Sequence, residues 1–367
     1  MRLTIVIHSL QGGGAERVTA MLANQWACRG WSVTIATLAD GPDSYRLEPN
    51  VRRVKLGVAA ASHGVVDAAW RNWVRVRELR RLLRTERPDV VLAMMATSAV
   101  LCVLASRGLG ARVIVSERIH PPMLNLGWIW DQARRLTFPL ADRVVVLAEE
   151  SRRWMESRHK RVRVVVIPNP VCMPLQPGDP FQDPARIVPA TSRVLLAVGR
   201  LDEQKGFDVL IAAFAALADR YPEWALVIAG DGPRRADLAA QARDAGLASR
   251  VLLPGHVGNL ANWYRRADLF VLSSRFEGFP NVLIEAMAHG CAVVSFDCDT
   301  GPRDIVRDHV DGVLVRPVGD AGALSGALAT VMADDGLRSR LGRNAVAVAE
   351  RFSLDRVMRC WDDVLVG

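Results

Sequence analysis

Short runs of apolar and β-branched residues alternate with longer segments of helical periodicity along almost the whole chain. We predict each short run as a strand. In the first half of the chain these runs cover residues 3–8, 32–37, 90–94, 112–116, 143–147 and 163–167. In the second half they cover residues 193–198, 225–229, 251–253, 269–272, 292–295 and 312–315. Because strand and helix alternate in two series, the predicted fold class is α/β, with two doubly wound, Rossmann-like lobes facing a cleft.

A dense run of prolines separates the two series. Seven of the 19 prolines lie between residues 168 and 189, and each fixes φ and removes a backbone donor. We therefore predict a first lobe over residues 1–168, an extended linker over 169–192 and a second lobe over 193–350. The last segment, residues 351–367, is predicted to end the chain in a helix.

The net charge of the chain is distributed unevenly between the two halves. Residues 1–170 carry 26 Lys and Arg against 14 Asp and Glu, a net charge of +12, and residues 171–367 carry 21 against 25, a net charge of −4. A basic lobe indicates a polyanion or an anionic membrane surface as a partner. No nucleic-acid partner is expected, because the basic residues are not interleaved with a recognised nucleic-acid motif.

Other features of the composition bear on where the protein works. The six cysteines are dispersed and include no C-x-x-C pair, which is typical of reduced thiols and argues against structural zinc. The longest uncharged run, residues 90–106, is too short to span a bilayer, and the N-terminus shows no signal-peptide pattern. We therefore expect a cytoplasmic protein that meets a membrane only at its surface.

Residues 67–87 have the periodicity of one amphipathic helix. Steps of 100° place Val76, Leu79, Leu82 and Leu83 on the arc that is predicted to face the core. The opposite face carries Trp70, Trp73, Arg77, Arg80, Arg81 and Arg84. Since tryptophan favours a membrane interface and arginine favours anionic headgroups, this face is predicted to contact the membrane or the acceptor. The alternative is an ordinary solvated face; residues 123–130 are a second apolar candidate.

Three consecutive glycines, Gly12, Gly13 and Gly14, follow the first predicted strand and precede a helix. Such a loop can turn backbone N–H groups toward an anion, so we predict a loop that binds phosphate or the acceptor. It is not the dinucleotide fingerprint, because Arg17 stands where a third glycine is required, and it lacks the Gly-Lys-Ser/Thr of a P-loop. A tight turn without a ligand is the alternative.

The second half carries two further loops with candidate chemistry. Arg200 follows Gly199 at the end of a predicted strand, and Lys205 comes five residues later, so two cations lie at the edge of the sheet where such folds bind ligands. Gly230 and Gly232 end the next strand in a turn that is expected to be open enough to admit a base or a ribose. These loops therefore predict a site for a phosphorylated ligand.

Two glutamates accompany the third candidate segment. Glu277 lies in a loop after a strand, and Asn281 is predicted to cap a helix that ends at Gly290. The helix N-terminus can offer N–H groups to a phosphate. Glu285 lies on the second turn of this helix, so both carboxylates can border one ligand. A glutamate near a helix start can also serve only as a partner of the helix dipole.

The motifs Gly-Arg-Leu…Lys-Gly, Gly-Asp-Gly-Pro and Phe-Glu-Gly-Phe-Pro-Asn-Val-Leu-Ile-Glu resemble those of the family 4 glycosyltransferases of the two-lobed GT-B type. The resemblance covers nearly the whole chain and implies that the second lobe binds a UDP-sugar. It assigns catalytic roles to Glu277, Arg200, Lys205 and His120. It assigns donor binding to Gly199, Gly230, Gly232, Gly278, Phe279, Pro280, Asn281 and Glu285.

Within that resemblance the cations offset the charge of the leaving diphosphate, Glu277 binds the donor sugar and Glu285 binds the ribose. His120 faces the sugar from the first lobe. The resemblance also implies retention of anomeric configuration, no metal ion and no cofactor, and a terminal helix that crosses back onto the first lobe.

The stretch 297–305 is similar to that of bacterial enzymes that add hexoses or N-acetylhexosamines to undecaprenyl-diphosphate-linked saccharides in surface glycan or glycoprotein glycan assembly. The partners implied are a UDP-sugar, a polyprenyl-diphosphate-linked saccharide and the inner face of the bacterial cell membrane. Asp304 departs from the pattern, which usually has glutamate there. The alternatives are a soluble glycosyltransferase that acts on a free or nucleotide-linked sugar and a sugar-nucleotide epimerase of the same shape.

Overall fold

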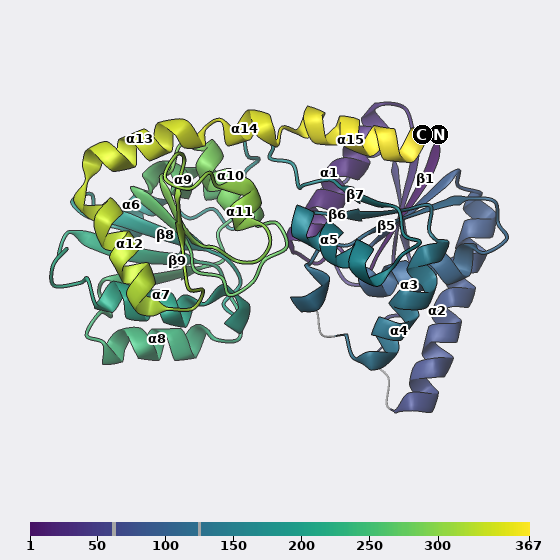
Figure 1. Cartoon of the computed structure of the whole chain (residues 1–367), viewed down its shortest axis with the longest axis horizontal. Helices are drawn as coiled ribbons and strands as arrows, with labels where there is room; N and C mark the ends of the chain where they lie inside the picture. The colour runs from purple at the N-terminus through teal and green to yellow at the C-terminus, as the bar shows by residue number, and fades with distance from the viewer. Residues whose placement is uncertain (61–63, 124–125) are drawn as a thin grey trace. The chain divides into compact units, whose positions relative to one another are not determined.

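Strand and helix alternate in two series in the structure, and each series forms its own unit. The computed structural model describes residues 1–60, 64–123 and 126–367. Unit 1 comprises Met1–Asn169 together with Val357–Gly367, and unit 2 comprises Pro170–Arg356. Each unit contains one parallel sheet covered by helices (Figure 1), so the predicted class, α/β with two Rossmann-like lobes, is confirmed.

The described part of unit 1 contains a seven-stranded sheet in the order β3-β2-β1-β4-β5-β6-β7. Its strands are β1 (Arg2–Ile7), β2 (Ser32–Thr37), β3 (Val51–Lys55), β4 (Val90–Met94), β5 (Arg112–Ser116), β6 (Arg143–Val146) and β7 (Val164–Val166). Its helices are α1 (Gly14–Cys28), α2 (Val65–Glu86), α3 (Ala96–Ser106), η1 (Pro121–Met123), α4 (Trp128–Thr137), η2 (Phe138–Leu140), α5 (Glu149–Arg158) and α15 (Leu354–Val366).

Strand β1 lies inside this sheet, between β2 and β4. Ile5 pairs with Ile35 of β2 on one side and with Leu92 of β4 on the other. Five of the six residues of β1 and all five of β4 are buried, because helices cover both faces of the sheet. In Figure 1, α2, α3 and α4 lie on one side of the sheet and α1 and α15 on the other. The loops after β1, β4 and β5 therefore meet at the C-terminal edge, where such sheets bind ligands.

Unit 2 repeats this order with a sheet β10-β9-β8-β11-β12-β13 among its described residues. Its strands are β8 (Arg193–Val198), β9 (Trp224–Ala229), β10 (Val251–Gly255), β11 (Leu269–Leu272), β12 (Val293–Phe296) and β13 (Val313–Val315). Its helices are α6 (Pro184–Ile187), η3 (Glu203–Lys205), α7 (Phe207–Ala215), α8 (Arg235–Asp244), α9 (Leu260–Arg266), α10 (Asn281–Ala288), α11 (Pro302–Ile305), α12 (Ala321–Ala333), α13 (Asp335–Ala345) and α14 (Val348–Arg351).

The proline-rich segment differs from the extended linker that we predict. Residues from Pro170 onward belong to unit 2, and the short helix α6 forms within the segment because Asp183 accepts a hydrogen bond from the N–H of Ala185. Val171 also donates a backbone hydrogen bond to Phe352. Prolines that interrupt longer helices thus still allow one helical turn, since proline is tolerated at the first helical position.

The terminal helix α15 packs on unit 1. Trp361 meets Trp26 of α1 edge to face, with ring centroids 6.1 Å apart, and the indole N–H of Trp26 donates to Asp362 Oδ1 at 3.1 Å. Arg112 donates to the carbonyl oxygens of Val364 and Leu365. These contacts satisfy carbonyl groups at the helix end that have no partner within the helix.

Candidate active site

A lysine and a glutamate meet at the C-terminal edge of the sheet in unit 2. Strands β8 and β11 are neighbours, so the loop that carries Lys205 and the loop that carries Glu277 emerge side by side. Lys205 Nζ lies 2.6 Å from Glu277 Oε1, and both side chains are largely buried. Ser274 Oγ donates to the same oxygen at 2.7 Å. The carboxylate is therefore held in one orientation by an ammonium group and a hydroxyl group.

The segment after β12 supports the Glu277 loop from the other side. Thr300 Oγ1 donates a hydrogen bond to the backbone carbonyl of Glu277. A Cβ at Gly301 would lie 2.7 Å from Pro280 Cδ, so only glycine allows this close approach. Burial raises the pKa of the Cys298 thiol to about 12, and the thiol donates to the carbonyl of Ser274 at 3.1 Å. A neutral thiol thus closes the same loop.

Arg200 does not join the pair. Its side chain is 71% exposed and forms an ion pair of 2.6 Å with Asp202, two residues later. Asp202 also accepts the backbone N–H of Lys205 through its other carboxylate oxygen. The structure therefore brings Lys205 and Glu277 together and leaves the guanidinium of Arg200 at the surface of the same loop.

The glycines of the two donor loops are explained by backbone packing. A Cβ at Gly230 would lie 1.9 Å from the carbonyl oxygen of Gly199, and one at Gly232 would lie 2.6 Å from that of Leu201. The neighbouring loop thus fills the space beside both glycines, while Asp231 and Pro233 of the same turn are exposed, and the expectation that this turn admits a base or a ribose stays a prediction. A Cβ at Gly199 would lie 3.2 Å from carbons of the Lys205 side chain. Glycine at these positions lets the loops pack closely and leaves room for the side chain of Lys205.

Helix α10 begins at Asn281, and Pro280 occupies the N-cap position. The prediction that Asn281 caps this helix is wrong, because the extended backbone of Pro280 already supplies the first carbonyl, which accepts the N–H of Leu283 at 3.1 Å. Gly278 and Phe279 lead into this turn, and the Phe279 ring meets Phe352 edge to face at 5.2 Å. The segment predicted to meet the donor phosphate thus lies directly before a helix N-terminus.

Glu285 lies inside unit 2 and is 2% exposed. The hydroxyl of Tyr264, on α9, donates to Glu285 Oε2 at 3.1 Å. Tyr264 also lies against His289, with ring centroids 5.3 Å apart. The sequence does not indicate that Tyr264 and Ser274 contact the two glutamates, because neither residue belongs to a recognised motif.

In unit 1 the predicted His120 follows β5 and is buried. Its Nδ1 lies 2.9 Å from Ser151 Oγ, in the first turn of α5. The glycine loop is exposed, and the N–H of Gly13 donates to the hydroxyl of Tyr45 at 2.9 Å. Tyr45 also donates to the carbonyl of Gly13. The N–H of Gly13, which we predict to bind phosphate, therefore already donates to a tyrosine hydroxyl. Gly12 and Gly14 lie on either side of Gly13.

Comparison with known proteins connects both units to one family. Residues 13–170 match the family described as "Glycosyl transferase 4-like domain". Residues 180–348 match the family "Glycosyl transferases group 1". The chain is a glycosyltransferase. Both halves of the predicted resemblance are thus confirmed, and the Lys205–Glu277 pair falls within the second match.

Relatives of this glycosyltransferase match it from end to end. A Campylobacter jejuni protein named GalNAc-alpha-(1->4)-GalNAc-alpha-(1->3)-diNAcBac-PP-undecaprenol alpha-1,4-N-acetyl-D-galactosaminyltransferase is 29% identical over 98% of this chain and 97% of its own. Sucrose-phosphate synthase of Thermosynechococcus elongatus superposes with a TM-score of 0.84 at 20% identity over 99% of this chain and 98% of its own. Anabaena Alr3699/HepE in complex with UDP and glucose gives 0.82 at 21% identity over 100% and 99%. These structures share the GT-B fold.

Helix α2 of the glycosyltransferase presents most of the predicted Trp and Arg face to solvent. Trp70 and Trp73 are 60% and 51% exposed and stack with centroids 4.9 Å apart, and the Arg77 guanidinium lies 5.5 Å from the Trp73 ring centroid. Arg81 and Arg84 are also exposed. On the opposite arc Leu79 and Leu83 are buried, and Val76 and Leu82 pack against the same core.

Arg80 departs from that face. Its guanidinium donates to the carbonyl oxygens of Ala105 at 2.9 Å and Arg107 at 2.7 Å, at the end of α3. The prediction that Arg80 belongs to the membrane surface is therefore wrong, because these C-terminal carbonyls draw the side chain toward the protein.

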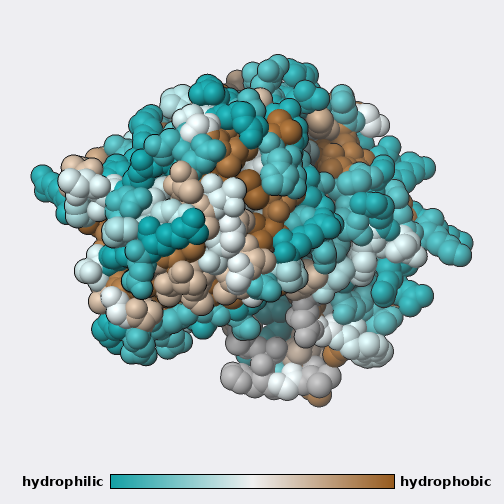
Figure 2. All heavy atoms as spheres, turned by 60° about the vertical axis from the view of Figure 1, so that its left-hand side comes forward, coloured by the Kyte–Doolittle hydropathy of each residue, from teal (hydrophilic) through white to brown (hydrophobic). Residues whose placement is uncertain are grey.

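Helix α4 adds an apolar surface that the sequence indicated only in part. Trp128, Ile129 and Leu136 are 75%, 61% and 72% exposed, whereas Arg134 of the same helix is buried. The helix thus turns a charge inward and large apolar groups outward. Leu124 and Asn125, within the predicted apolar segment 123–130, lie outside the described residues. Figure 2 shows a few apolar spheres at the lower edge of the view, among hydrophilic and intermediate ones.

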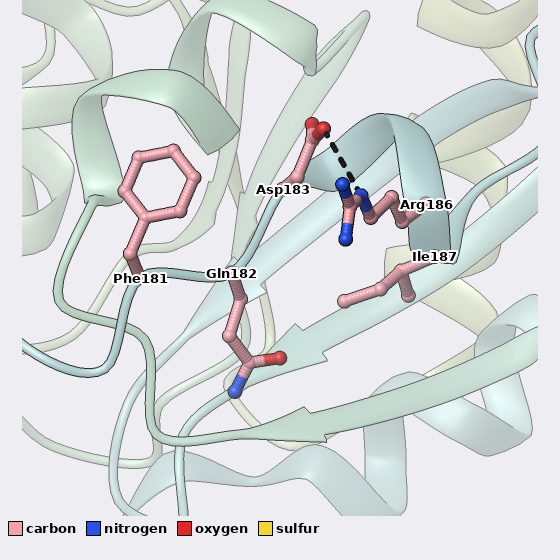
Figure 3. Close-up of a pocket in the computed structure, with 5 residues that line it drawn as sticks. All are labelled: Phe181, Gln182, Asp183, Arg186 and Ile187. Atoms are coloured by element: carbon pink, nitrogen blue, oxygen red, sulfur yellow. Dashed lines mark ion pairs between the residues drawn. The ribbon is translucent and has the colours of Figure 1, made fainter.

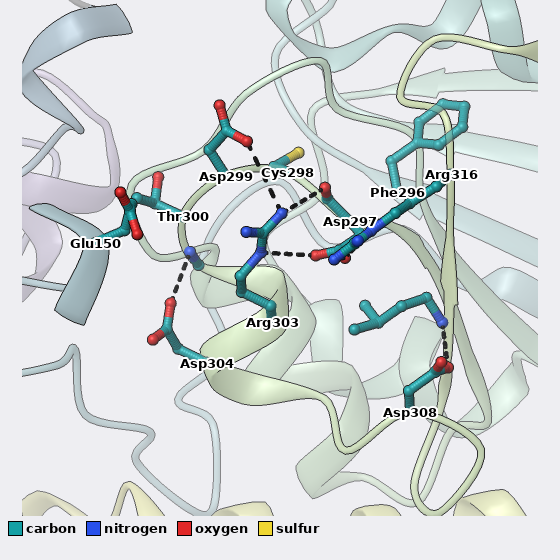
Figure 4. Close-up of polar contacts among 12 residues, drawn as sticks. Glu150, Phe296, Asp297, Cys298, Asp299, Thr300, Arg303, Asp304, Asp308 and Arg316 are labelled. Atoms are coloured by element: carbon teal, nitrogen blue, oxygen red, sulfur yellow. Dashed lines mark hydrogen bonds and ion pairs between the residues drawn. The ribbon is translucent and has the colours of Figure 1, made fainter.

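Asp304 acts within a polar network that braces the turn before α11. Its Oδ2 accepts the N–H of Gly301 at 3.2 Å, and the adjacent Thr300 holds the Glu277 loop. Nearby, Arg303 Nε donates to the buried Asp297 at 2.9 Å, and Arg316 also pairs with Asp297 (Figure 4). The aspartate that departs from the family pattern therefore positions the turn that supports Glu277.

A hollow of about 380 Å³ in unit 2 lies apart from these residues, along the proline-rich segment. It is lined by Phe181, Gln182, Asp183, Arg186 and Ile187 (Figure 3). The Gln182 amide donates to the carbonyls of Pro254 and His256, which fixes this segment to the end of β10. None of the predicted site residues belongs to this lining.

Among the described residues, no three or more His, Cys, Asp or Glu side chains are grouped so that they could hold a metal ion. No helix in the described ranges has both the length and the hydropathy that a bilayer span requires.

Proposed function

We propose that this glycosyltransferase moves a hexose or N-acetylhexosamine from a UDP-sugar, with retention of anomeric configuration, to a polyprenyl-diphosphate-linked saccharide. The Campylobacter relative, whose name gives an undecaprenol-linked acceptor, supports the acceptor. The fold shared with a protein crystallised with UDP and glucose supports the donor. The product would enter surface glycan or glycoprotein glycan assembly.

The observation that carries the proposal is the contact of Lys205 with Glu277. In the proposed reaction the bond between the anomeric carbon and the β-phosphate oxygen breaks, and negative charge grows on the diphosphate. An acceptor hydroxyl oxygen bonds to the anomeric carbon on the same face, and its proton passes to the leaving phosphate. Lys205 Nζ, with Arg200 from the same loop, offsets that charge, and Glu277 accepts hydrogen bonds from hydroxyls of the sugar. Because cations and backbone N–H groups can do this, we propose that the reaction needs no metal ion or cofactor.

Glu285 and the glycine loop complete the proposed substrate contacts. Glu285 would accept the ribose hydroxyls and keep Tyr264 as its partner within the protein. Gly12, Gly13 and Gly14 would present N–H groups to the acceptor, with the Tyr45 hydroxyl displaced from Gly13. His120 would face the sugar, oriented by its contact with Ser151.

We further propose that the reaction occurs at the inner face of the cell membrane. Two surfaces of unit 1 support this: the exposed Trp70, Trp73 and Arg77 of α2, and the exposed apolar side chains of α4. Tryptophan and arginine together suit the headgroup region of an anionic bilayer. A soluble acceptor and sugar-nucleotide epimerisation remain the competing functions.

The test replaces Lys205, which is proposed to face the leaving diphosphate, and Glu277, which is proposed to bind the sugar. We expect Lys205→Ala and Glu277→Gln each to lower turnover by about 100-fold or more, because one lost transition-state stabiliser typically costs that much. Lys160→Ala is the matched control, since the chain has only three lysines and Lys160 is exposed. Melting temperatures establish that each variant folds.

Product analysis with labelled UDP-sugars and a polyprenyl-diphosphate saccharide separates the competing functions. Transfer of label to the lipid fraction supports the proposal. A changed sugar nucleotide without transfer identifies an epimerase, and transfer only to a water-soluble sugar refutes the lipid-linked acceptor. Activity in EDTA is expected to equal that without it. Near wild-type turnover by Lys205→Ala would place the diphosphate elsewhere.

A further inference from the structure

Unit 1 buries two arginines close to the end of β5, and they differ in their partners. Arg134 of α4 is 4% exposed and lies 3.9 Å from Glu117 Oε1. Arg118 is 6% exposed and donates to neutral side-chain oxygens, Ser116 Oγ at 3.3 Å and Asn169 Oδ1. A buried guanidinium that faces only neutral groups is costly, because it has lost water without gaining a counter-charge.

The carboxylate next in sequence does not supply that counter-charge. Glu117 points toward Arg134, as expected where successive side chains of an extended segment leave on opposite faces. Burial raises the pKa of Glu117 to about 7 and lowers the pKa of Arg118 to about 9. Both pKa shifts disfavour the charged form of the side chain. This is expected where burial outweighs the attraction of any opposite charge nearby.

The position of Arg118 is one where a ligand can supply the missing charge. It stands two residues beyond the end of β5, at the C-terminal edge of the sheet where open α/β sheets bind their ligands. Its Nε has no hydrogen-bond partner among the described residues, so part of the guanidinium is unused. His120, two residues later, is the histidine that we expect to face the sugar. A guanidinium fork binds phosphoryl oxygens in two parallel hydrogen bonds.

We propose that Arg118 binds a phosphoryl group of a substrate and is retained in its buried position for that purpose. The inference rests on the proposed function, in which both donor and acceptor carry a diphosphate. The phosphoryl group belongs either to the nucleotide sugar or to the polyprenyl diphosphate, and its chemistry is the same in both. The competing explanation is structural: Arg118 would only tie the end of β5 to Asn169, the last residue of the first segment of unit 1.

Stability without ligand separates these explanations. A buried charge that serves only a ligand should be replaceable by an apolar side chain of similar volume at no cost, whereas breaking a buried ion pair is destabilising. We therefore expect Arg118→Met to melt at or above the wild-type temperature. Arg134→Met, the matched control, loses the ion pair of Arg134 with Asp131 at 2.7 Å and the cation that faces Glu117, so it should melt several degrees lower than wild type.

Ligand titration completes the test. Farnesyl diphosphate and UDP are titrated separately against the full-length wild type, Arg118→Met, Arg118→Lys and Arg134→Met. We expect Arg118→Met to bind one of the two ligands about tenfold more weakly or worse, because a charge-assisted hydrogen bond is lost. The ligand that is affected identifies the source of the phosphoryl group. Arg118→Lys keeps the charge and should retain part of the affinity, and Arg134→Met should retain all of it.

Two results would overturn the inference. One is a marked loss of melting temperature in Arg118→Met with unchanged affinity for both ligands, which would establish the structural tie to Asn169. The other applies if Arg118→Met fails to fold: Arg118→Lys would then bind both ligands as tightly as the wild type. That result would contradict the inference, because a lysine cannot reproduce the two parallel hydrogen bonds of a guanidinium. Failure of the wild type to bind UDP would instead refute the proposed function, so the two failures are distinguishable.

Discussion

At the scale of single residues, three buried glutamates differ in what stabilises their charge. Glu277 receives an ammonium and a hydroxyl on one oxygen, and Glu285 receives a phenol. Glu117 has its nearest cation, Arg134, at 3.9 Å, beyond hydrogen-bond distance, and its Oε1 has no hydrogen-bond partner among the described residues. The first two carboxylates are oriented for binding, whereas burial disfavours the ionised form of the third.

This difference predicts a pH dependence of stability that belongs to Glu117. Burial raises the pKa of Glu117 from 4.5 to about 7, so the folded state binds this proton more tightly than the unfolded state. Protonated Glu117 therefore stabilises the folded state fully below about pH 4.5, and this stabilisation is lost as the pH rises through about 7. A pKa shift of this size corresponds to about 3 kcal/mol of unfolding free energy at most. We expect Glu117→Gln to abolish this loss and to be more stable than wild type at pH 8.

Urea unfolding at intervals from pH 5 to pH 8.5 measures the effect. The control is Glu150→Gln on α5, because Glu150 pairs with Arg153 near the surface and is 39% exposed. That variant should follow the wild-type curve. Parallel curves for wild type and Glu117→Gln would mean that Glu117 stays ionised in the fold, paired with Arg134 through the whole range.

At the scale of elements, the hydrophobic pattern predicts strands whose residues are apolar throughout. It located every described strand except β3, whose sequence Val-Arg-Arg-Val-Lys carries three charges in five residues. A strand at the edge of a sheet can expose such side chains: Arg52, for example, is 64% exposed and pairs with Glu86 at 3.1 Å. Edge strands therefore escape a search for apolar runs, since only part of their surface is buried.

Side-chain partners from different elements are less accessible to the sequence than the elements themselves. The spacing of Lys205 and Glu277 shows only that their strands can be neighbours, and the sheet order then brings them together. Tyr264 and Ser151 reach Glu285 and His120 from elsewhere in the fold, and no periodicity indicates either contact. The sequence thus identifies candidate chemistry, and the packing determines which groups meet.

Arg80 provides a test of one such contact. We expect Arg80→Ala to reduce the free energy of unfolding by about 1–3 kcal/mol, because two hydrogen bonds from a charged donor to the end of α3 are lost. Arg84→Ala, one turn further along the same helix, is exposed and should change stability by less than about 0.5 kcal/mol. Urea denaturation measures both. Equal effects of the two substitutions would show that Arg80 is solvated in solution.

At the scale of the whole molecule, exposed apolar side chains gather in the basic part of the chain. Among the described residues of 66–140, nine large apolar side chains are exposed: Val66, Trp70, Trp73, Leu104, Met123, Trp128, Ile129, Leu136 and Leu140. They lie on α2, α3, η1, α4 and η2, and α3 packs against α2, α4 and η2. The same half of the sequence carries the net charge of +12. Apolar and basic groups in one region suit an anionic bilayer, whereas a second copy of the chain would bring like charges together.

The proposed membrane contact therefore has an apolar and an electrostatic part, which separate variants can test. Replacing Arg77, Arg81 and Arg84 by Gln should weaken binding to vesicles with anionic lipid by about 100-fold, at about 1 kcal/mol per arginine, and should reduce its salt dependence.

Replacing Trp128, Ile129 and Leu136 by Ser should weaken binding to neutral and anionic vesicles alike, because burial of apolar area does not depend on lipid charge. The control replaces Val310, Val318 and Val346 of unit 2, which are 38–47% exposed, by Ser and should bind as wild type. UDP affinity should be unchanged in all three variants, since none touches the donor residues. Sedimentation with vesicles at rising salt measures each part. If both unit 1 variants sediment with vesicles as the wild type does, α2 and α4 are only solvated surfaces. If the wild type is a dimer and the variant with Ser at Trp128, Ile129 and Leu136 is a monomer, the partner of this surface is a second copy of the chain.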